Sequence, residues 1–250
     1  MKQLAIKAAK EAGKILIKNF GKIKKIEKKD KNTLVTNVDI EVEEKVIGLI
    51  EQKYPKHSIL SEEVGEINKK SDYKWLIDPL DGTHNYVHGL SLCGVSIALE
   101  QKKEVKLGVI YMPFFDQLFV AEKGKGAFIN GKRIKASNIN KLNNSLLLFC
   151  SSLYKNKKSK FWYLNRVIHK ISRIRMSGAA VFDLTSIAQG NAEILMDFDT
   201  HPWDVAAGFL LIKEAGGRIT DFNGKEVNHY CKEFIASNGK IHKKILKCLK

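Results

Sequence analysis

Six carboxylates in this sequence lie where apolar segments begin or end. Two of them, Asp78 and Asp81, follow the apolar run 75–77 in the stretch IDPLDGTHNY. The full set is Asp39, Glu62, Glu63, Asp78, Asp81 and Asp204. Hard cations such as Mg²⁺ bind carboxylate and carbonyl oxygens and keep water for a substrate phosphate. Carboxylates that converge within one fold are therefore a candidate site for phosphoryl chemistry, in which two ions lie about 4 Å apart.

The residues between and after the two aspartates suit such a site. Pro79 would stiffen the segment, and the Leu80 carbonyl would then point towards the metals as a further oxygen ligand. Gly82 and Thr83 would let backbone amides and a hydroxyl approach a phosphate.

Each carboxylate also has a purely structural interpretation. Pro, Asp and Gly are the residues of tight turns, so the stretch 78–82 also predicts a turn. Thr36 and Asp39 have the spacing of a loose capping box, and Asp204 in a first helical turn would suit the helix dipole. The two adjacent glutamates would suit a solvated loop end. Taken singly, the carboxylates leave both interpretations open.

Hydrophobic periodicity predicts the elements that would position these side chains. Helices are predicted at 2–20 and 38–54, short strands at 57–63 and 73–81, and an antiparallel meander from 93 to 134. After residue 136, short strands alternate with helices, which is typical of an α/β unit. The predicted strands there are 145–151, 172–176, 192–198, 218–222 and 233–237, and the predicted helices are 161–170, 179–189, 203–215 and a C-terminal helix.

The composition is that of an ordinary globular protein. The chain has 250 residues, of which 44% are hydrophobic and 28% charged, so it can bury a substantial core. It contains no apolar run that would span a membrane and no signal-peptide pattern. The four cysteines show neither close pairing nor zinc-like spacing, which favours reduced thiols in a cytoplasmic protein. The net charge of +16 fits either a phosphate-rich partner or lysine-rich solvated surfaces.

Several motifs resemble those of the inositol monophosphatase family, in the same order and over nearly the whole chain. They are DPLDGTHNY (78–86), WDVAAG (203–208), SEE (61–63), VTNVD (35–39) and EAGG (214–217). The resemblance implies an α-β-α-β-α five-layer sandwich of the inositol monophosphatase and fructose-1,6-bisphosphatase type. Residues 1–136 would supply N-terminal helices, an antiparallel sheet and the metal-binding carboxylates. Residues 137–250 would form an α/β part that completes the site and lines the substrate pocket, within one compact body.

The resemblance also implies roles for the matching residues. Two or three magnesium ions would be bound by Glu62, Glu63, Asp78, the carbonyl of Leu80, Asp81 and Asp204. Thr83 and Asp39 match the pair that positions and deprotonates the attacking water, and Glu62 is a third candidate catalytic residue. The implied reaction is in-line hydrolysis of a phosphate monoester by metal-activated water, sensitive to lithium.

On the substrate side, the resemblance implies contacts from both halves of the chain. The candidates are Glu62, Leu80, Asp81, Gly82, Thr83, Ser177, Gly178, Ala179, Asp197, His201 and Asp204. Asp197 stands where the family often has a glutamate that binds inositol hydroxyls, and it is one methylene shorter. Inositol phosphate as the substrate is therefore left open. His84 also differs from many relatives, and its role stays open as well.

The resulting prediction is a magnesium-dependent phosphatase for an inositol monophosphate or a related sugar or polyol phosphate, acting as a cytoplasmic homodimer. Two alternatives within the family are a phosphatase for phosphoadenosine phosphate, of the nucleotide type, and a fructose-bisphosphate phosphatase. An alternative of another class is a protein that binds RNA or the transcription machinery and has secondary phosphatase activity, for which the positive charge leaves room.

Overall fold

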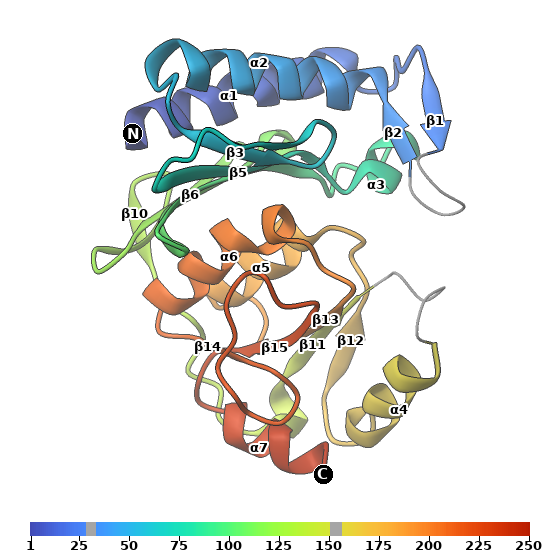
Figure 1. The fold of residues 1–250 in the computed structure, drawn as a ribbon. Helices are drawn as coiled ribbons and strands as arrows, with labels where there is room; N and C mark the ends of the chain where they lie inside the picture. The colour runs from blue at the N-terminus through green and yellow to red at the C-terminus, as the bar shows by residue number, and fades with distance from the viewer. Residues whose placement is uncertain (29–33, 151–156) are drawn as a thin grey trace.

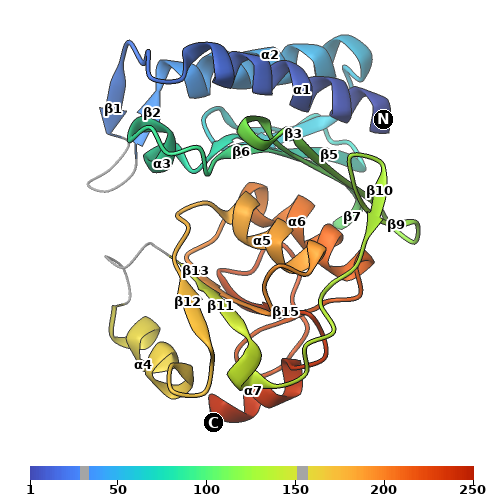
Figure 2. The same ribbon diagram turned by 180° about the vertical axis from the view of Figure 1, so that it is seen from behind.

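The computed structural model describes residues 1–28, 34–150 and 157–250, which form alternating layers of helices and sheets (Figure 1 and Figure 2). One outer layer pairs α1 (Lys2–Asn19) with α2 (Asn37–Lys53). The middle layer pairs α5 (Ala180–Gln189) with α6 (Pro202–Glu214), and the other outer layer contains α4 (Lys157–Val167) and α7 (His242–Cys248). A sheet lies between successive helical layers, so the predicted α-β-α-β-α sandwich is confirmed.

The first sheet has eight strands in the order β10-β9-β8-β7-β6-β5-β3-β4. Their bounds are β3 (Ser58–Ser61), β4 (Gly65–Ile67), β5 (Tyr73–Asp81), β6 (Gly94–Gln101), β7 (Glu104–Met112), β8 (Gln117–Glu122), β9 (Gly126–Ile129) and β10 (Lys132–Ile134). The meander predicted over 93–134 is confirmed, because β6 to β10 pair antiparallel in succession. The prediction of a wholly antiparallel sheet is wrong at one place, where β3 and β5 run parallel. The edge strand β4 reverses the chain between them.

The second sheet has five strands in the order β12-β11-β13-β15-β14. Their bounds are β11 (Leu146–Phe149), β12 (Arg173–Arg175), β13 (Ile194–Phe198), β14 (Arg218–Thr220) and β15 (Glu233–Ser237). β11 runs parallel to both neighbours, and helices α4 and α5 provide the crossovers that parallel pairing requires. The predicted alternation of strands and helices is therefore confirmed. The helix predicted at 161–170 begins earlier, at Lys157, and residue 151 of the predicted strand 145–151 lies outside the described residues.

Several short elements were not predicted. They are the antiparallel pair β1 (Ile26–Lys28) and β2 (Leu34–Thr36), the edge strand β4, the short helix α3 (Thr83–Val87), and the 3₁₀ turns η1 (Pro113–Phe115) and η2 (Leu142–Asn144). The strand predicted at 73–81 is confirmed as β5, and the turn predicted from the Pro, Asp and Gly residues of this stretch comes only at the end of that strand. Asp78 and Asp81 belong to β5, and the chain turns only at Gly82, which has a φ of 83°.

Small residues let the middle helices pack closely on the first sheet. A Cβ atom on Gly208 of α6 would lie 2.5 Å from Leu184 Cδ1 of α5. A Cβ atom on Gly108 of β7 would lie 2.8 Å from the carbonyl oxygen of Ala207. The WDVAAG motif therefore has a packing function: its small residues bring α6 against the sheet and hold Asp204 at the first turn of that helix.

Two further predictions from the sequence concern membrane spans and cysteines. None of the helices within the described ranges is long and apolar enough to cross a membrane. All four cysteines are free, as predicted. Burial raises the pKa of the Cys93 and Cys150 thiols to about 12, so both stay protonated at neutral pH.

A buried histidine links α7 to the second sheet. The ring of His242 is fully buried and lies 2.9 Å from Thr220 Oγ1 through Nε2 and 2.8 Å from Ser237 Oγ through Nδ1. Burial lowers the pKa of His242 to about 4, and the positive charge of Arg218 lowers it further. The folded protein therefore holds this ring neutral at pH values where the unfolded chain protonates it.

We predict that His242 makes the fold sensitive to acid. Because its pKa is lower in the folded state, the free energy of unfolding should fall as pH drops from about 6.5 to about 4, by up to about 3 kcal/mol. Urea unfolding of the wild type and of His242→Gln at pH 7 and pH 4.5 would measure this. The stability difference between the two proteins should shrink on acidification, and an unchanged difference would contradict the assignment.

Candidate active site

β5 ends in an irregularity that brings Asp78 and Asp81 to the same face of the sheet. In a regular strand, residues three apart point to opposite faces. Against β6, Asp78 pairs with Ser96. Asp81 pairs with Gly94, so β5 holds one residue more than β6 between the two pairs, and the alternation of side chains is reversed. Pro79 lies within this irregular segment, where a strand tolerates a residue without an N–H group.

Gly82 turns the chain from β5 into α3. A Cβ atom at this position would lie 2.8 Å from the carbonyl oxygen of Leu92, and φ is positive, so only glycine fits. Thr83 is the first residue of α3. Its Oγ1 lies 3.0 Å from the Leu80 carbonyl oxygen and 3.3 Å from Asp39 Oδ1, so this hydroxyl connects the end of β5 with the start of α2.

Asp39 is fixed by the capping box of α2. Thr36 Oγ1 accepts hydrogen bonds from the N–H groups of Val38 and Asp39, and Asp39 Oδ2 accepts one from the Thr36 N–H at 2.8 Å. The predicted capping box is therefore confirmed, and Asp39 is fully buried. Its other oxygen, Oδ1, is the one that Thr83 approaches. Asp39 therefore caps α2 through Oδ2 and contacts Thr83 through Oδ1.

Glu62 reaches the site because β3 and β5 are parallel. Strands that run parallel bring their carboxyl ends to the same edge of a sheet. Ser61 pairs with Ile77, and the Glu62 N–H donates to the Ile77 carbonyl at 3.2 Å. Glu62 therefore follows β3 beside the point where Asp78 follows Ile77.

Asp204 is held at the first turn of α6. The His201 N–H donates to Asp204 Oδ2 at 2.7 Å, so Asp204 completes a capping box at the start of that helix. Ser96 Oγ donates to the Trp203 carbonyl at 3.2 Å and ties this end of α6 to β6, directly opposite Asp78. The His201 ring is exposed and stacks on Trp203, with ring centroids 4.8 Å apart.

We call Glu62, Asp78, Asp81 and Asp204 the carboxylate cluster, because their charges act on one another. Burial raises the pKa of Asp78 well above its usual value, and the charges of the other three members raise it further. Desolvation also raises the pKa of Asp81 to about 8, with contributions from Asp204 and Glu62. Backbone N–H groups of Val181 and Ala180, at the start of α5, oppose this shift; the Val181 N–H lies 2.8 Å from Asp81 Oδ2.

Asn85 fixes the predicted substrate loop 177–179, although no role for it was predicted from the sequence. Its Nδ2 donates to the carbonyl oxygen of Ser177 at 2.9 Å and to that of Leu92 at 2.7 Å. Ser177 Oγ accepts the Ala179 N–H at 3.1 Å, and Gly178 adopts a φ of 80°. Asn85 belongs to the motif DPLDGTHNY, which was the signal that could have identified it.

Two aspartates lie on the side predicted to receive the substrate alcohol. Desolvation raises the pKa of Asp197 in β13 to about 7, and the charge of Asp204 contributes. Asp183 in α5 is only 4% exposed, and burial raises its pKa well above the usual value. Among the described residues, Asp183 Oδ1 has no hydrogen-bond partner. Asp183 was not predicted as a site residue, because it lies within an otherwise apolar helical pattern.

Other candidates lie at the margin of the cluster. The Glu63 N–H donates to Glu43 Oε1 at 3.0 Å, and the Glu63 side chain is partly exposed. His84 is exposed on α3, as His201 is on α6. Glu43 itself is buried in α2 and was also not singled out from the sequence.

The donor atoms of the cluster suit a hard divalent cation. All are carboxylate oxygens, and burial together with the neighbouring negative charges raises the pKa of Asp78 and of Asp81, so a cation at this place would offset an unfavourable charge. In the described part of the chain, no three His, Cys, Asp or Glu side chains are grouped so as to hold a metal ion as they lie. The individual ligand assignments therefore remain predictions.

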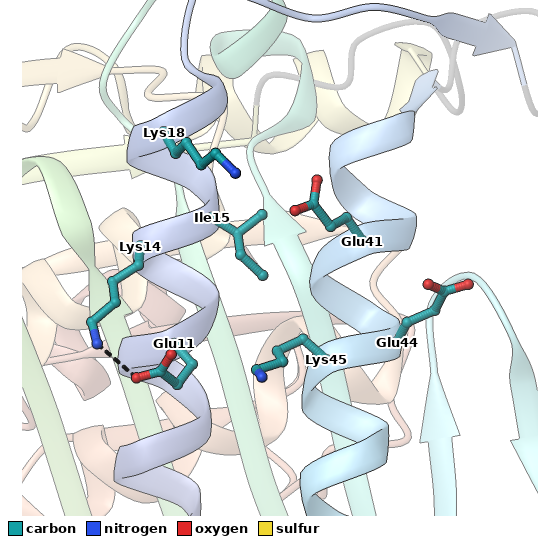
Figure 3. Close-up of a pocket in the computed structure, with 7 residues that line it drawn as sticks. All are labelled: Glu11, Lys14, Ile15, Lys18, Glu41, Glu44 and Lys45. Atoms are coloured by element: carbon teal, nitrogen blue, oxygen red, sulfur yellow. Dashed lines mark hydrogen bonds and ion pairs between the residues drawn. The ribbon is translucent and has the colours of Figure 1, made fainter.

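A separate surface pocket of about 530 Å³ lies between α1 and α2 (Figure 3). It is lined by Glu11, Lys14, Ile15, Lys18, Glu41, Glu44 and Lys45. Its three lysines and three glutamates balance in charge, and Glu11 pairs with Lys14 at 2.7 Å. No member of the carboxylate cluster lines it, so we do not assign it to the active site.

We predict that the cluster destabilises the metal-free fold. Without added metal, Asp78→Asn should be more stable than the wild type by about 1 kcal/mol, or roughly 2–4 °C in Tm, because one repelling carboxylate is gone. Millimolar Mg²⁺ should raise the Tm of the wild type more than that of the variant. Thermal unfolding with chelator and with Mg²⁺ would measure both effects. The exposed Asp72→Asn change serves as the control, and a variant less stable than the wild type in chelator would refute the prediction.

Comparison with known proteins shows which family this chain belongs to. The family model described as "Inositol monophosphatase family" matches residues 1–250. The chain is 37% identical to the fructose-1,6-bisphosphatase/inositol-1-monophosphatase of Thermotoga maritima, over 97% of this chain and 93% of that protein. It is 35% identical to the Nus factor SuhB of Escherichia coli, over 98% of this chain and 94% of that protein.

Solved structures agree with this result. The extragenic suppressor protein suhB from Bartonella henselae superposes with a TM-score of 0.95 at 33% identity, covering 99% of this chain and 97% of that one. The inositol monophosphatase of Thermotoga maritima gives a TM-score of 0.91 at 36% identity, covering 99% of this chain and 95% of that one. The family model, the sequence relatives and the solved structures all match nearly the whole chain. The protein therefore belongs to the inositol monophosphatase family.

Proposed function

We propose that this phosphatase-family protein is a magnesium-dependent enzyme that hydrolyses a small phosphate monoester, an inositol monophosphate or a related sugar or polyol phosphate. The observation that carries the proposal is the carboxylate cluster beside the Thr83–Asp39 contact. Desolvated carboxylates that repel one another are unfavourable unless a cation offsets them. Such an arrangement suits metal-assisted phosphoryl transfer, for which carboxylates and a proton acceptor must lie together.

Glu62, Asp78, Asp81, Asp204 and the Leu80 carbonyl would hold the magnesium ions, with Glu63 at a weaker position. Bound Mg²⁺ supplies positive charge that acidifies water and offsets the negative charge of the leaving alkoxide. The protein's part is to orient that water. A water that donates to Thr83 Oγ1 would be aligned while Thr83 passes its own proton towards Asp39 Oδ1, which lies 3.3 Å away. No covalent enzyme intermediate is needed.

The amides of Gly82 and Thr83 would receive the phosphate oxygens, because Gly82 allows close approach of the backbone. The loop 177–179 and Asp197 would contact the alcohol. With a pKa near 7, Asp197 can accept hydrogen bonds from sugar or polyol hydroxyls when ionised and donate one when protonated. Relatives at 37% identity are named for both fructose-1,6-bisphosphatase and inositol-1-monophosphatase activity, which supports this substrate class.

We predict that hydrolysis requires both the metal and Asp81. Phosphate release from inositol 1-phosphate should be lost in excess chelator and return with Mg²⁺. Asp81→Asn should lower kcat by at least about 100-fold, because the cluster then loses one charge and one ligand oxygen. Malachite-green detection of phosphate would measure both effects, with circular dichroism to confirm folding. Activity that persists in Asp81→Asn or in chelator would rule out the metal mechanism.

We predict that the length of the side chain at 197 sets the choice of alcohol. A panel of inositol 1-phosphate, fructose bisphosphate, histidinol phosphate and phosphoadenosine phosphate should show activity on at least one monoester. Asp197→Glu, which adds one methylene, should raise kcat/KM for inositol 1-phosphate relative to the others by roughly 3–10-fold. An unchanged ranking of the four substrates would show that Asp197 does not contact the alcohol.

A second function is favoured by a specific observation. Two relatives at 35–36% identity are named Nus factor SuhB, and this chain carries a net charge of +16. We propose as an alternative that the protein also binds RNA or the transcription machinery. An RNA mobility shift that weakens steeply with salt and survives Asp81→Asn would support this function. Absence of a shift at low salt would exclude direct RNA binding.

A further inference from the structure

Glu43 lies one turn after Asp39 on the same face of α2 and is buried, with 1% of its surface exposed. Its Oε1 accepts hydrogen bonds from the hydroxyl of Ser61 and from the N–H of Glu63, the latter at 3.0 Å. These two donors flank Glu62 in the chain. A single buried oxygen thus binds the side chain of the residue before a predicted magnesium ligand and the backbone of the residue after it.

The segment 61–63 is held from two directions. On one side, the Glu62 N–H donates to the Ile77 carbonyl of β5 at 3.2 Å. On the other side, the Glu43 carboxylate provides acceptors from α2. Beyond residue 63 the chain reverses into β4, and Ser61 pairs with Gly65 across this turn. Removal of the Glu43 acceptor would free one side of this segment.

We infer that Glu43 is a positioning residue for the metal site: it fixes the turn after β3 so that Glu62 is directed at the carboxylate cluster. This inference rests on the proposed function, because it concerns how tightly that cluster binds Mg²⁺. Residues that orient metal ligands from behind commonly change metal affinity or activity by about 10–100-fold when they are removed. Helix α2 then serves the site twice, through Asp39 at Thr83 and through Glu43 at the turn.

Three variants separate positioning from simple stability. Glu43→Ala removes the acceptor, whereas Glu43→Gln keeps an oxygen that can accept from both donors. Glu193→Ala is a matched control, because Glu193 is 3% exposed and accepts from the Ser137 hydroxyl and from the Leu146 N–H, both at 2.8 Å. Glu193 precedes β13, at the opposite end of that strand from Asp197.

Calorimetric titration of each metal-free protein with MgCl₂ gives the Kd, and thermal unfolding gives the stability. Glu43→Ala should raise the Kd for Mg²⁺ by about 10–100-fold, and Glu43→Gln by clearly less. Glu193→Ala should lower the Tm without changing the Kd. Should Glu43→Ala fail to fold, Ser61→Ala removes one donor and should raise the Kd by a smaller factor.

The outcomes distinguish the inference from the proposed function. If the wild type neither binds Mg²⁺ nor hydrolyses monoesters, the proposed function fails. If the wild type does both while Glu43→Ala binds Mg²⁺ as tightly, the positioning role is overturned. The positioning role is also overturned if Glu193→Ala raises the Kd equally, since a loss of general stability would then explain both variants. A Glu43→Gln protein that binds Mg²⁺ as weakly as Glu43→Ala would also overturn the positioning role, because the effect would then come from the charge of Glu43 and not from its hydrogen bonds.

Discussion

Electrostatic repulsion among desolvated carboxylates is the constraint on which the rest of this structure depends. Asp78 is buried and Asp81 is partly buried beside two further acids, and desolvation and the neighbouring charges raise the pKa of each. Such a cluster is unfavourable, so it forms only where a rigid framework holds its members together. The layers of helices and sheets provide that framework, and they account for much of the family's sequence pattern.

The four members of the cluster come from three different elements. Glu62 follows β3, the two aspartates end β5, and Asp204 begins α6. The start of α5 offers backbone N–H groups to Asp81, and α2 approaches through Asp39 and Thr83. No two of these elements would form the site alone. The close packing of Gly208 on α5 and of Gly108 on α6 is therefore as much a requirement of the site as the carboxylates themselves.

Much of this arrangement could be predicted from the sequence, and the reasons differ from one element to another. Apolar periodicity predicted α1 and α2, the alternation of short strands and helices predicted α6, and the motifs around 78–86 and 203–208 predicted the carboxylates. The parallel pairing of β3 with β5 could not be predicted, because it depends on the short edge strand β4. Asp183, Asn85 and Glu43 were missed because their roles arise from burial and from contacts with residues distant in the chain. The strand over 73–81, with Pro79 in it, was predicted, whereas its irregular pairing with β6 was not, because sequence patterns do not reveal a register shift.

That irregularity makes the length of β5 as important as its composition. Between the pairs Asp78–Ser96 and Asp81–Gly94, β5 has one residue more than its partner. Deleting one residue there would restore regular pairing: the two aspartates would then be two residues apart and would still share a face, but the irregular backbone between them, which includes the Leu80 carbonyl, would be lost. Substitution of Leu80 by another apolar residue keeps its carbonyl in place. Among relatives this segment should therefore vary in side chains but not in length, and counting residues between the two aspartates would separate intact sites from broken ones.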